Sequence, residues 1–84
     1  MGELYFRGAL AAYLGSNYIN GPVYEWQIET IKENISRYCE NNIDHSSLSY
    51  QEKENQKHQM KQSLEIYIQG VKDKFRQDGR LIEG

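Results

Sequence analysis

Three side chains could serve nucleophilic or acid–base chemistry: the thiol of Cys39 and the imidazoles of His45 and His58. A catalytic centre needs a nucleophile, a base and an orienting group that converge in space. His45 belongs to the run Asp-His-Ser-Ser at 44–47, whose members are adjacent in the chain and cannot face each other as a triad does. We interpret this run as loop and helix-capping residues and Cys39 as a small buried thiol. The sequence therefore predicts no catalytic residue and a protein that is not an enzyme.

The same side chains are poor candidates for binding a metal. Structural zinc sites have four ligands and catalytic sites at least three protein ligands, often in paired spacings such as Cys-x-x-Cys. No such pair is formed by the available ligands, which are Cys39, Asp44, His45 and His58. The glycines near the start do not form the Gly-x-Gly-x-x-Gly loop that cradles phosphates. We therefore expect neither a metal nor another cofactor.

Trp26 is the side chain best suited to binding a partner. On a helix it lies about 200° around the axis from Tyr24, among polar residues. A tryptophan in that position is either covered by the first segment of the chain or presented to a partner, where tryptophan contributes strongly to binding. Tyrosine also suits half-buried positions at interfaces. The predicted partner-binding residues are Trp26, Tyr24 and Tyr67.

Six cations recur in four-residue steps in the last third of the chain. This cationic stripe comprises Lys53, Lys57, Lys61, Lys72, Arg76 and Arg80. Such a stripe could follow the phosphates of a nucleic acid. Alternatively, it is a solvated face paired with nearby carboxylates, namely Glu52, Glu54, Glu65 and Asp73. Few aromatic residues lie between the cations, so we do not expect recognition of bases, and nucleic-acid binding is the second hypothesis after protein binding.

Two long helices would position these residues. The first is predicted from Val23 to about Asn41, with Pro22 at its first position, where proline is favoured. Its apolar side chains recur at spacings of four and three, which indicates packing against another helix. They are Tyr24, Ile28, Ile31, Ile35 and Tyr38.

The second long helix begins at the capping box Ser49-x-x-Glu52 and ends at Gly79. Its C-terminal half has the same apolar spacing, in Met60, Leu64, Tyr67, Val71 and Phe75. The spacing extends backwards onto polar residues that cannot form a core, namely Lys53, Gln56 and Lys57. We therefore expect the first three turns of this helix to protrude from the domain or to pair with something else.

The first segment, Glu3 to Leu14, is ambiguous. Apolar residues at even positions indicate a strand, whereas alanine and leucine favour a helix, which Gly15 would end. We expect a helix, and hence an all-α fold: one three-helix domain over residues 1–84, built on an antiparallel helical hairpin. The alternative is an α+β fold with a short N-terminal β-hairpin.

Size and composition restrict the function. A core built from 84 residues rarely supplies more than about 3–5 kcal/mol of stability, so self-association would help. The single cysteine excludes an internal disulfide framework, and the longest apolar run, Ala9 to Leu14, is too short to span a membrane. The lone thiol favours a reducing, intracellular setting, and the net charge of −2 disfavours a general nucleic-acid coat. The chain is therefore expected to be a cytoplasmic protein-binding or regulatory module. It would act as an adaptor or inhibitor and would form a homo-oligomer, such as a homodimer, without binding membranes.

Overall fold

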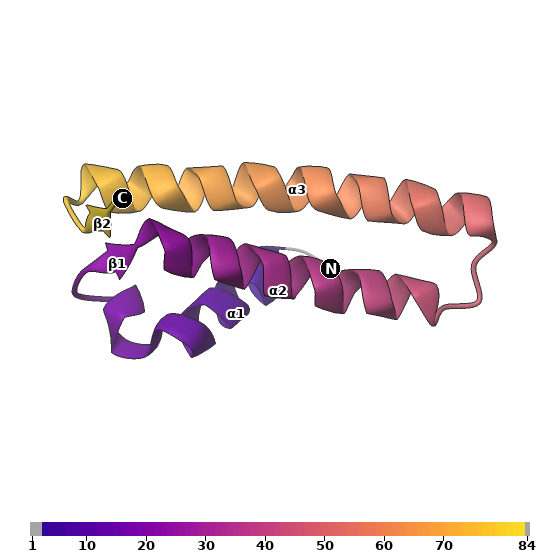
Figure 1. Ribbon diagram of the computed structural model, residues 1–84, viewed down its shortest axis with the longest axis horizontal. Helices are drawn as coiled ribbons and strands as arrows, with labels where there is room; N and C mark the ends of the chain where they lie inside the picture. The colour runs from indigo at the N-terminus through magenta and orange to yellow at the C-terminus, as the bar shows by residue number, and fades with distance from the viewer. Residues whose placement is uncertain (1–2, 84) are drawn as a thin grey trace.

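Three segments of the chain form α-helices in the computed structural model, which describes residues 3–83. The elements are α1 (Glu3–Leu14), the 3₁₀ turn η1 (Gly15–Tyr18), β1 (Val23–Tyr24), α2 (Glu25–Asp44), α3 (Tyr50–Gln77) and β2 (Leu81–Ile82). α2 and α3 run antiparallel, and α1 packs beside them near the end of the hairpin that holds β1 and β2 (Figure 1). The predicted all-α class and helical hairpin are confirmed, and the first segment is a helix rather than a β-hairpin.

The core lies where the three helices meet. Each helix contributes apolar side chains spaced three, four or seven residues apart, which places them on one face. The buried residues are Phe6, Leu10 and Leu14 of α1, Val23 of β1, Ile28, Ile31, Ile35 and Cys39 of α2, and Leu64, Ile68 and Phe75 of α3.

The predicted apolar seam of α2 was wrong at both ends. Tyr24 and Tyr38 are 42% and 52% exposed, whereas Cys39 is buried. Tyr38 instead stacks on Tyr5 of α1, with ring centroids 5.5 Å apart. Because an α-helix has 3.6 rather than 3.5 residues per turn, a strict four-and-three spacing drifts away from the buried face.

The seam of α3 was correct in part. Leu64 and Phe75 are buried, but Met60, Tyr67 and Val71 are only half-buried, and the fully buried Ile68 lies outside the predicted set. α3 packs against both α2 and α1, so its apolar face is wider than a seam between two helices.

The predicted ends of α3 are confirmed. The Glu52 N–H donates to Ser49 Oγ, and the Ser49 N–H donates to Glu52 Oε1, at 3.3 Å and 3.4 Å. At the other end, Gly79 has a φ of +72°. Its N–H donates to the Arg76 carbonyl, and the Arg80 N–H donates to the Phe75 carbonyl, as in a Schellman motif. Gly15, with a φ of +60°, follows the last residue of α1 as expected.

The predicted start of α2 was wrong. Val23 and Tyr24 form β1 and pair in parallel with Leu81 and Ile82 of β2, so the helix begins only at Glu25. The Tyr24 N–H donates to Gln27 Oε1 at 3.1 Å, which caps the first turn. This strand pair joins residues far apart in sequence, which local patterns cannot indicate.

The molecule is elongated. Its principal extents are 44 × 21 × 19 Å and its radius of gyration is 14.1 Å, compared with about 12 Å for a compact domain of this length. α1 starts beside Tyr38, so the part of the hairpin beyond it consists of two helices only. The polar first turns of α3 lie in this part, in agreement with the prediction, although Lys53 and Lys57 are half-buried there.

Candidate protein-binding surfaces

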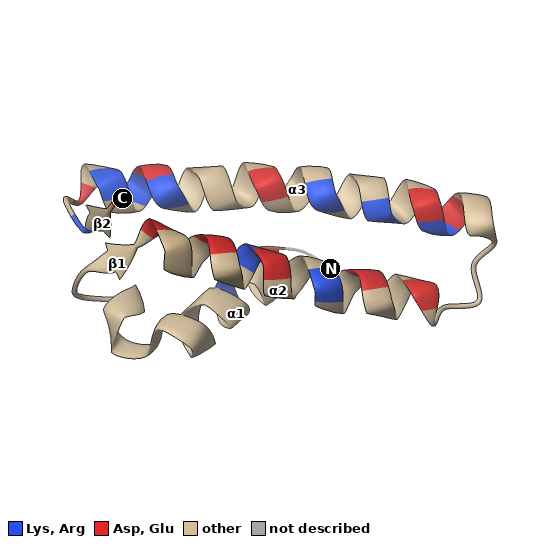
Figure 2. Ribbon diagram, viewed as in Figure 1, with Lys and Arg blue, Asp and Glu red and all other residues tan. Residues whose placement is uncertain are grey.

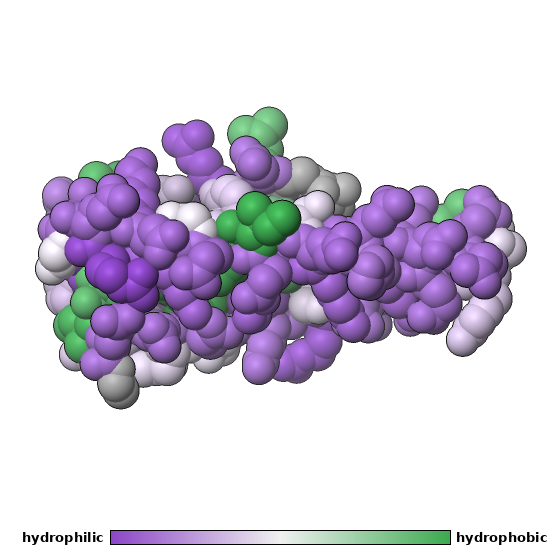
Figure 3. Space-filling view, turned by 90° about the horizontal axis from the view of Figure 1, so that it is seen from above, coloured by the Kyte–Doolittle hydropathy of each residue, from purple (hydrophilic) through white to green (hydrophobic). Residues whose placement is uncertain are grey.

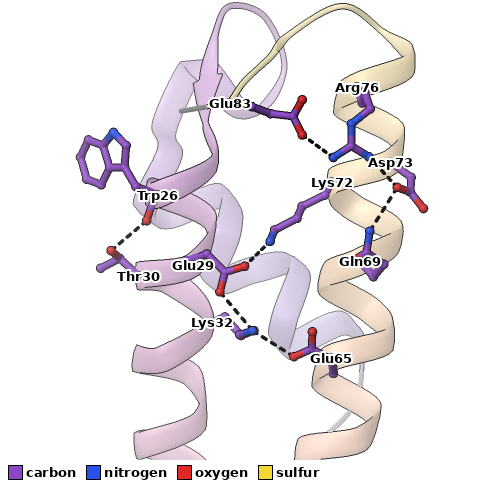
Figure 4. A network of polar contacts seen from close by, with 10 residues as sticks. All are labelled: Trp26, Glu29, Thr30, Lys32, Glu65, Gln69, Lys72, Asp73, Arg76 and Glu83. Atoms are coloured by element: carbon purple, nitrogen blue, oxygen red, sulfur yellow. Dashed lines mark hydrogen bonds and ion pairs between the residues drawn. The ribbon is translucent and has the colours of Figure 1, made fainter.

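The cationic stripe forms a ladder of ion pairs between the two long helices. From the strand end to the loop end of the hairpin, Lys72 contacts Glu29, Lys61 contacts Glu40 at 3.5 Å, and Lys57 contacts Asp44 at 2.6 Å. One pair among them has the lysine on α2 and the carboxylate on α3: Lys32 contacts Glu65 at 2.9 Å. Figure 2 shows the acidic residues of α2 opposite basic residues of α3, and Figure 4 shows the pairs around Glu29.

The ladder shifts the pKa values of Glu29, Lys32 and Lys57. The hydrogen bond from Lys72, together with that from Lys32, lowers the pKa of the Glu29 carboxyl. The hydrogen bond to Glu65 raises the pKa of Lys32, and the hydrogen bond to Asp44 raises that of Lys57. Each of these shifts stabilises the charged form, so Glu29, Lys32 and Lys57 stay ionised near neutral pH.

The other members of the stripe also contact their own chain. Lys53 donates to the Asp44 carbonyl at 2.8 Å. Arg76 bonds to Asp73 and Glu83, at 2.9 Å and 2.7 Å. Arg80 donates to the carbonyls of Gly21 and Asn17, and its guanidinium lies 4.8 Å from the centre of the Phe75 ring.

The structure thus places the stripe largely in internal contacts. Of the carboxylates expected to neutralise it, Asp73 pairs with Arg76 and Glu54 lies 3.9 Å from Lys57. Four of the six cations contact residues of α2, namely Lys53, Lys57, Lys61 and Lys72. These ion pairs between helices contribute little energy where they are exposed, but they favour one antiparallel register of α2 against α3.

Trp26 lies on the outward surface of α2. Its side chain is 58% exposed, so α1 does not cover it. Figure 4 shows the indole pointing away from α3, and its backbone carbonyl accepts a hydrogen bond from the Thr30 hydroxyl at 2.9 Å. The Tyr24 ring lies beside it, with centroids 6.2 Å apart, and the pair forms an exposed aromatic surface.

Carboxylates surround this aromatic pair. Glu25, Glu29 and Glu33 line a shallow hollow of about 400 Å³ together with Trp26 and Thr30. Glu29 is held by two lysines, whereas Glu25 and Glu33 form no hydrogen bond or ion pair with any residue that the structure describes. We call Tyr24, Glu25, Trp26, Thr30 and Glu33 the Trp26 face; it combines exposed aromatic area with two uncompensated negative charges.

Tyr67 lies on a different surface. It packs on Phe6 of α1, with ring centroids 5.5 Å apart, and burial raises the pKa of its hydroxyl. It lines a groove of about 760 Å³ between α1 and α3. Tyr24 and Trp26 are therefore brought together, and Tyr67 is separate from them.

Sequence reasoning missed two apolar residues of this groove. Ile19 and Ile66 are 74% and 75% exposed, and both line the groove. Seen from the side of α3, most of the molecular surface is hydrophilic, with an apolar area over the middle of that helix (Figure 3). Ile66 fell outside the predicted seam, and an isoleucine off the seam of an amphipathic helix is the signal that could have revealed the groove.

The residues considered for catalysis and metal binding do not converge. The Cys39 side chain is buried, and burial raises the pKa of its thiol, whereas His45 and His58 are exposed. His45 Nδ1 lies 2.7 Å from the Asn41 carbonyl oxygen, in a helix-capping contact. Among residues 3–83, no three His, Cys, Asp or Glu side chains lie close enough to hold a metal ion.

Within the described part of the chain, no helix has both the length and the apolar character needed to cross a membrane. The sequence matches no protein-family model and no curated protein, and the fold matches no solved structure.

Proposed function

We propose that the chain is a non-enzymatic protein-binding module that docks a partner on the Trp26 face. The observation that supports this proposal is the exposure of Trp26, which stays 58% accessible on the outward surface of α2 among the described residues. Removing a large aromatic side chain from water is favourable, so an exposed tryptophan beside an exposed tyrosine gains free energy when a partner covers both.

The backbone beneath the aromatic pair is well fixed, which lowers the cost of binding. Trp26 lies in the first turn of α2, where Tyr24 is tied to Gln27 and Thr30 to the Trp26 carbonyl. β1, which carries Tyr24, is paired with β2. A preorganised surface loses less conformational entropy on binding than a mobile one.

In this proposal the module acts by occupying a partner's surface, as an adaptor or inhibitor in the cytoplasm. The buried thiol of Cys39 is compatible with a reducing compartment. We do not extend the proposal to nucleic acids, because the cations of the stripe already contact carboxylates and carbonyls of the same chain. Nucleic-acid binding stays a prediction without further support.

Affinity capture from a native lysate tests the proposal. The wild-type chain is compared with Trp26→Ala and with a matched control, Tyr50→Ala, which removes another exposed aromatic side chain (77% exposed) at the far end of the hairpin. We expect Trp26→Ala to lose the captured protein, and Tyr50→Ala to retain it, with or without nuclease. Capture that Trp26→Ala leaves unchanged would overturn the proposal, and capture that nuclease abolishes would favour the nucleic-acid hypothesis.

A further inference from the structure

The groove between α1 and α3 has the shape of a site for another helix. Its apolar side chains include Tyr67, Val71 and Phe75, which follow one another at four-residue intervals and form a ridge along α3. The neighbouring ridge of α3 consists of Ile66, Gly70 and Lys74. Ridges of this kind are the elements by which helices pack against each other.

Gly70 leaves a gap in that second ridge. Glycine inside a helix costs about 0.5–1 kcal/mol relative to alanine. A Cβ at Gly70 would meet no atom within 4 Å, so no contact inside the chain requires a glycine there. The gap lies open at the groove, between Ile66 and Lys74, where a large side chain of an approaching helix would fit.

The groove also carries positive charge that the chain does not neutralise. Across residues 3–83, three Lys or Arg side chains form no hydrogen bond or ion pair, namely Arg7, Arg37 and Lys74, and two of them line the groove. Arg80 also lines it and donates only to backbone carbonyls. Glu3 and Asp78 are the carboxylates of the lining, so cations exceed anions there by one.

We infer that the occupant of this groove is the Trp26 face of a second copy of the same chain. The inference rests on the proposed role of Trp26 in binding. The face offers what the groove lacks: a large exposed side chain to fill the gap at Gly70, and the unpaired carboxylates Glu25 and Glu33 to meet Arg7 and Lys74. The groove volume of about 760 Å³ is within the range of clefts that enclose ligands larger than an indole.

This association joins two different surfaces of the chain. The Trp26 face belongs to β1 and α2, and the groove to α1, η1 and α3, so each bound copy still presents one unoccupied face and one unoccupied groove. Contacts of this heterologous kind build rings or open chains rather than a two-fold dimer.

Sedimentation of the intact chain and three variants tests the inference. Gly70→Glu fills the gap and places a negative charge against the acidic Trp26 face. Gly8→Glu is its matched control, since Gly8 is also an exposed helical glycine with open space around it but lies outside the groove. We expect the average mass of wild type and Gly8→Glu to rise with concentration. Trp26→Ala and Gly70→Glu should each associate about thirtyfold more weakly.

Mixing the two defective variants gives the decisive result. Trp26→Ala keeps an intact groove and Gly70→Glu keeps an intact Trp26 face, so an equimolar mixture should form heterodimers that grow no further. Wild type that stays monomeric, Gly70→Glu that associates like wild type, or a mixture that stays monomeric would each overturn the inference. Circular dichroism checks that the variants are folded. Capture of a different protein through Trp26 without self-association would leave the proposed function standing while this inference fails.

Discussion

Trp26 and Ile31 lie on opposite faces of α2, so the same substitution should affect them differently. Ile31 is buried among the three helices, and Trp26 is largely exposed. We expect Ile31→Ala to lower the free energy of unfolding by about 2–5 kcal/mol and Trp26→Ala by about 1 kcal/mol or less. Denaturant titrations of both variants measure these differences. A loss at Trp26 as large as that at Ile31 would make Trp26 a structural residue and remove the basis for its binding role.

Two glycines of the C-terminal region should respond in opposite ways to alanine. Gly70 has an ordinary helical environment with open space, so Gly70→Ala should raise the free energy of unfolding by about 0.5–1 kcal/mol. Gly79 has a φ of +72°, which a Cβ strains, so Gly79→Ala should lower it by roughly 1 kcal/mol. Thermal melts of the two variants measure the pair. A loss of stability at Gly70 would show that the gap serves packing inside the chain.

At the scale of the helices, sequence patterns predicted what depends on neighbouring residues. The capping box at Ser49, the glycine stop at Gly79 and the buried isoleucines of α2 all follow from local spacing, and all are found. The errors arose where distant segments meet. Val23 lies in a strand rather than in α2 because it pairs with Leu81. The width of the buried face of α3 depends on how α1 packs beside that helix.

For the candidate surfaces too, the sequence predicted local features and missed those that depend on distant segments. The sequence identified Trp26 because a tryptophan among polar residues is a local feature, but it could not decide between burial and exposure, which depends on the position of α1. The partners of the cationic stripe were only partly predicted, since four of its six cations contact α2 across the hairpin. The groove between α1 and α3 was missed because Ile66, off the predicted seam, is its one local signal, and the rest of the surface forms only where two helices meet.

The ion-pair ladder makes the stability of the hairpin dependent on pH. The contacts that Glu29 makes with Lys72 and Lys32 lower its pKa below the ordinary value of 4.5. The ionised Glu29 carboxylate therefore stabilises the folded chain above pH 4.5. This stabilisation is lost as the pH falls through the lower pKa that Glu29 has in the folded state. We expect Glu29→Gln to reduce stability at pH 7 by at most about 1 kcal/mol and to flatten the decline in acid.

Glu33→Gln is the matched control, because Glu33 is exposed on the same helix and forms no ion pair with a described residue. Denaturant titrations across the acid range should give it the profile of the wild type. If Glu29→Gln and Glu33→Gln had the same profile, the contacts of Glu29 would not contribute to the acid dependence.

The two ends of the hairpin should differ in local stability. From Ser49 to Gln59, α3 contributes no buried residue, whereas Leu64 and Ile68 pack in the core. Local opening is easiest where few apolar contacts must break. We expect amide hydrogens in the first three turns of α3 to exchange faster than those around Leu64 and Val71, as measured by hydrogen exchange with mass spectrometry. Equal protection would show that the loop end of the hairpin is held by contacts other than apolar burial.

The whole molecule combines a small core with an extended shape, and this makes association a source of stability. Only the part of the hairpin beside α1 has three helices around its core, so much of the chain gains little from its own packing. A second copy that binds only the folded chain raises its stability by about 1.4 kcal/mol at a concentration about ten times the dissociation constant. For a domain of this size that amounts to roughly 6–11 °C in melting temperature.

We expect the melting temperature of the wild type to rise with protein concentration by this order, and that of Gly70→Glu to stay constant over the same range. Differential scanning calorimetry at several concentrations measures both. A wild-type melting temperature independent of concentration, with full reversibility, would mean that the small core suffices alone and that the Trp26 face serves a different protein.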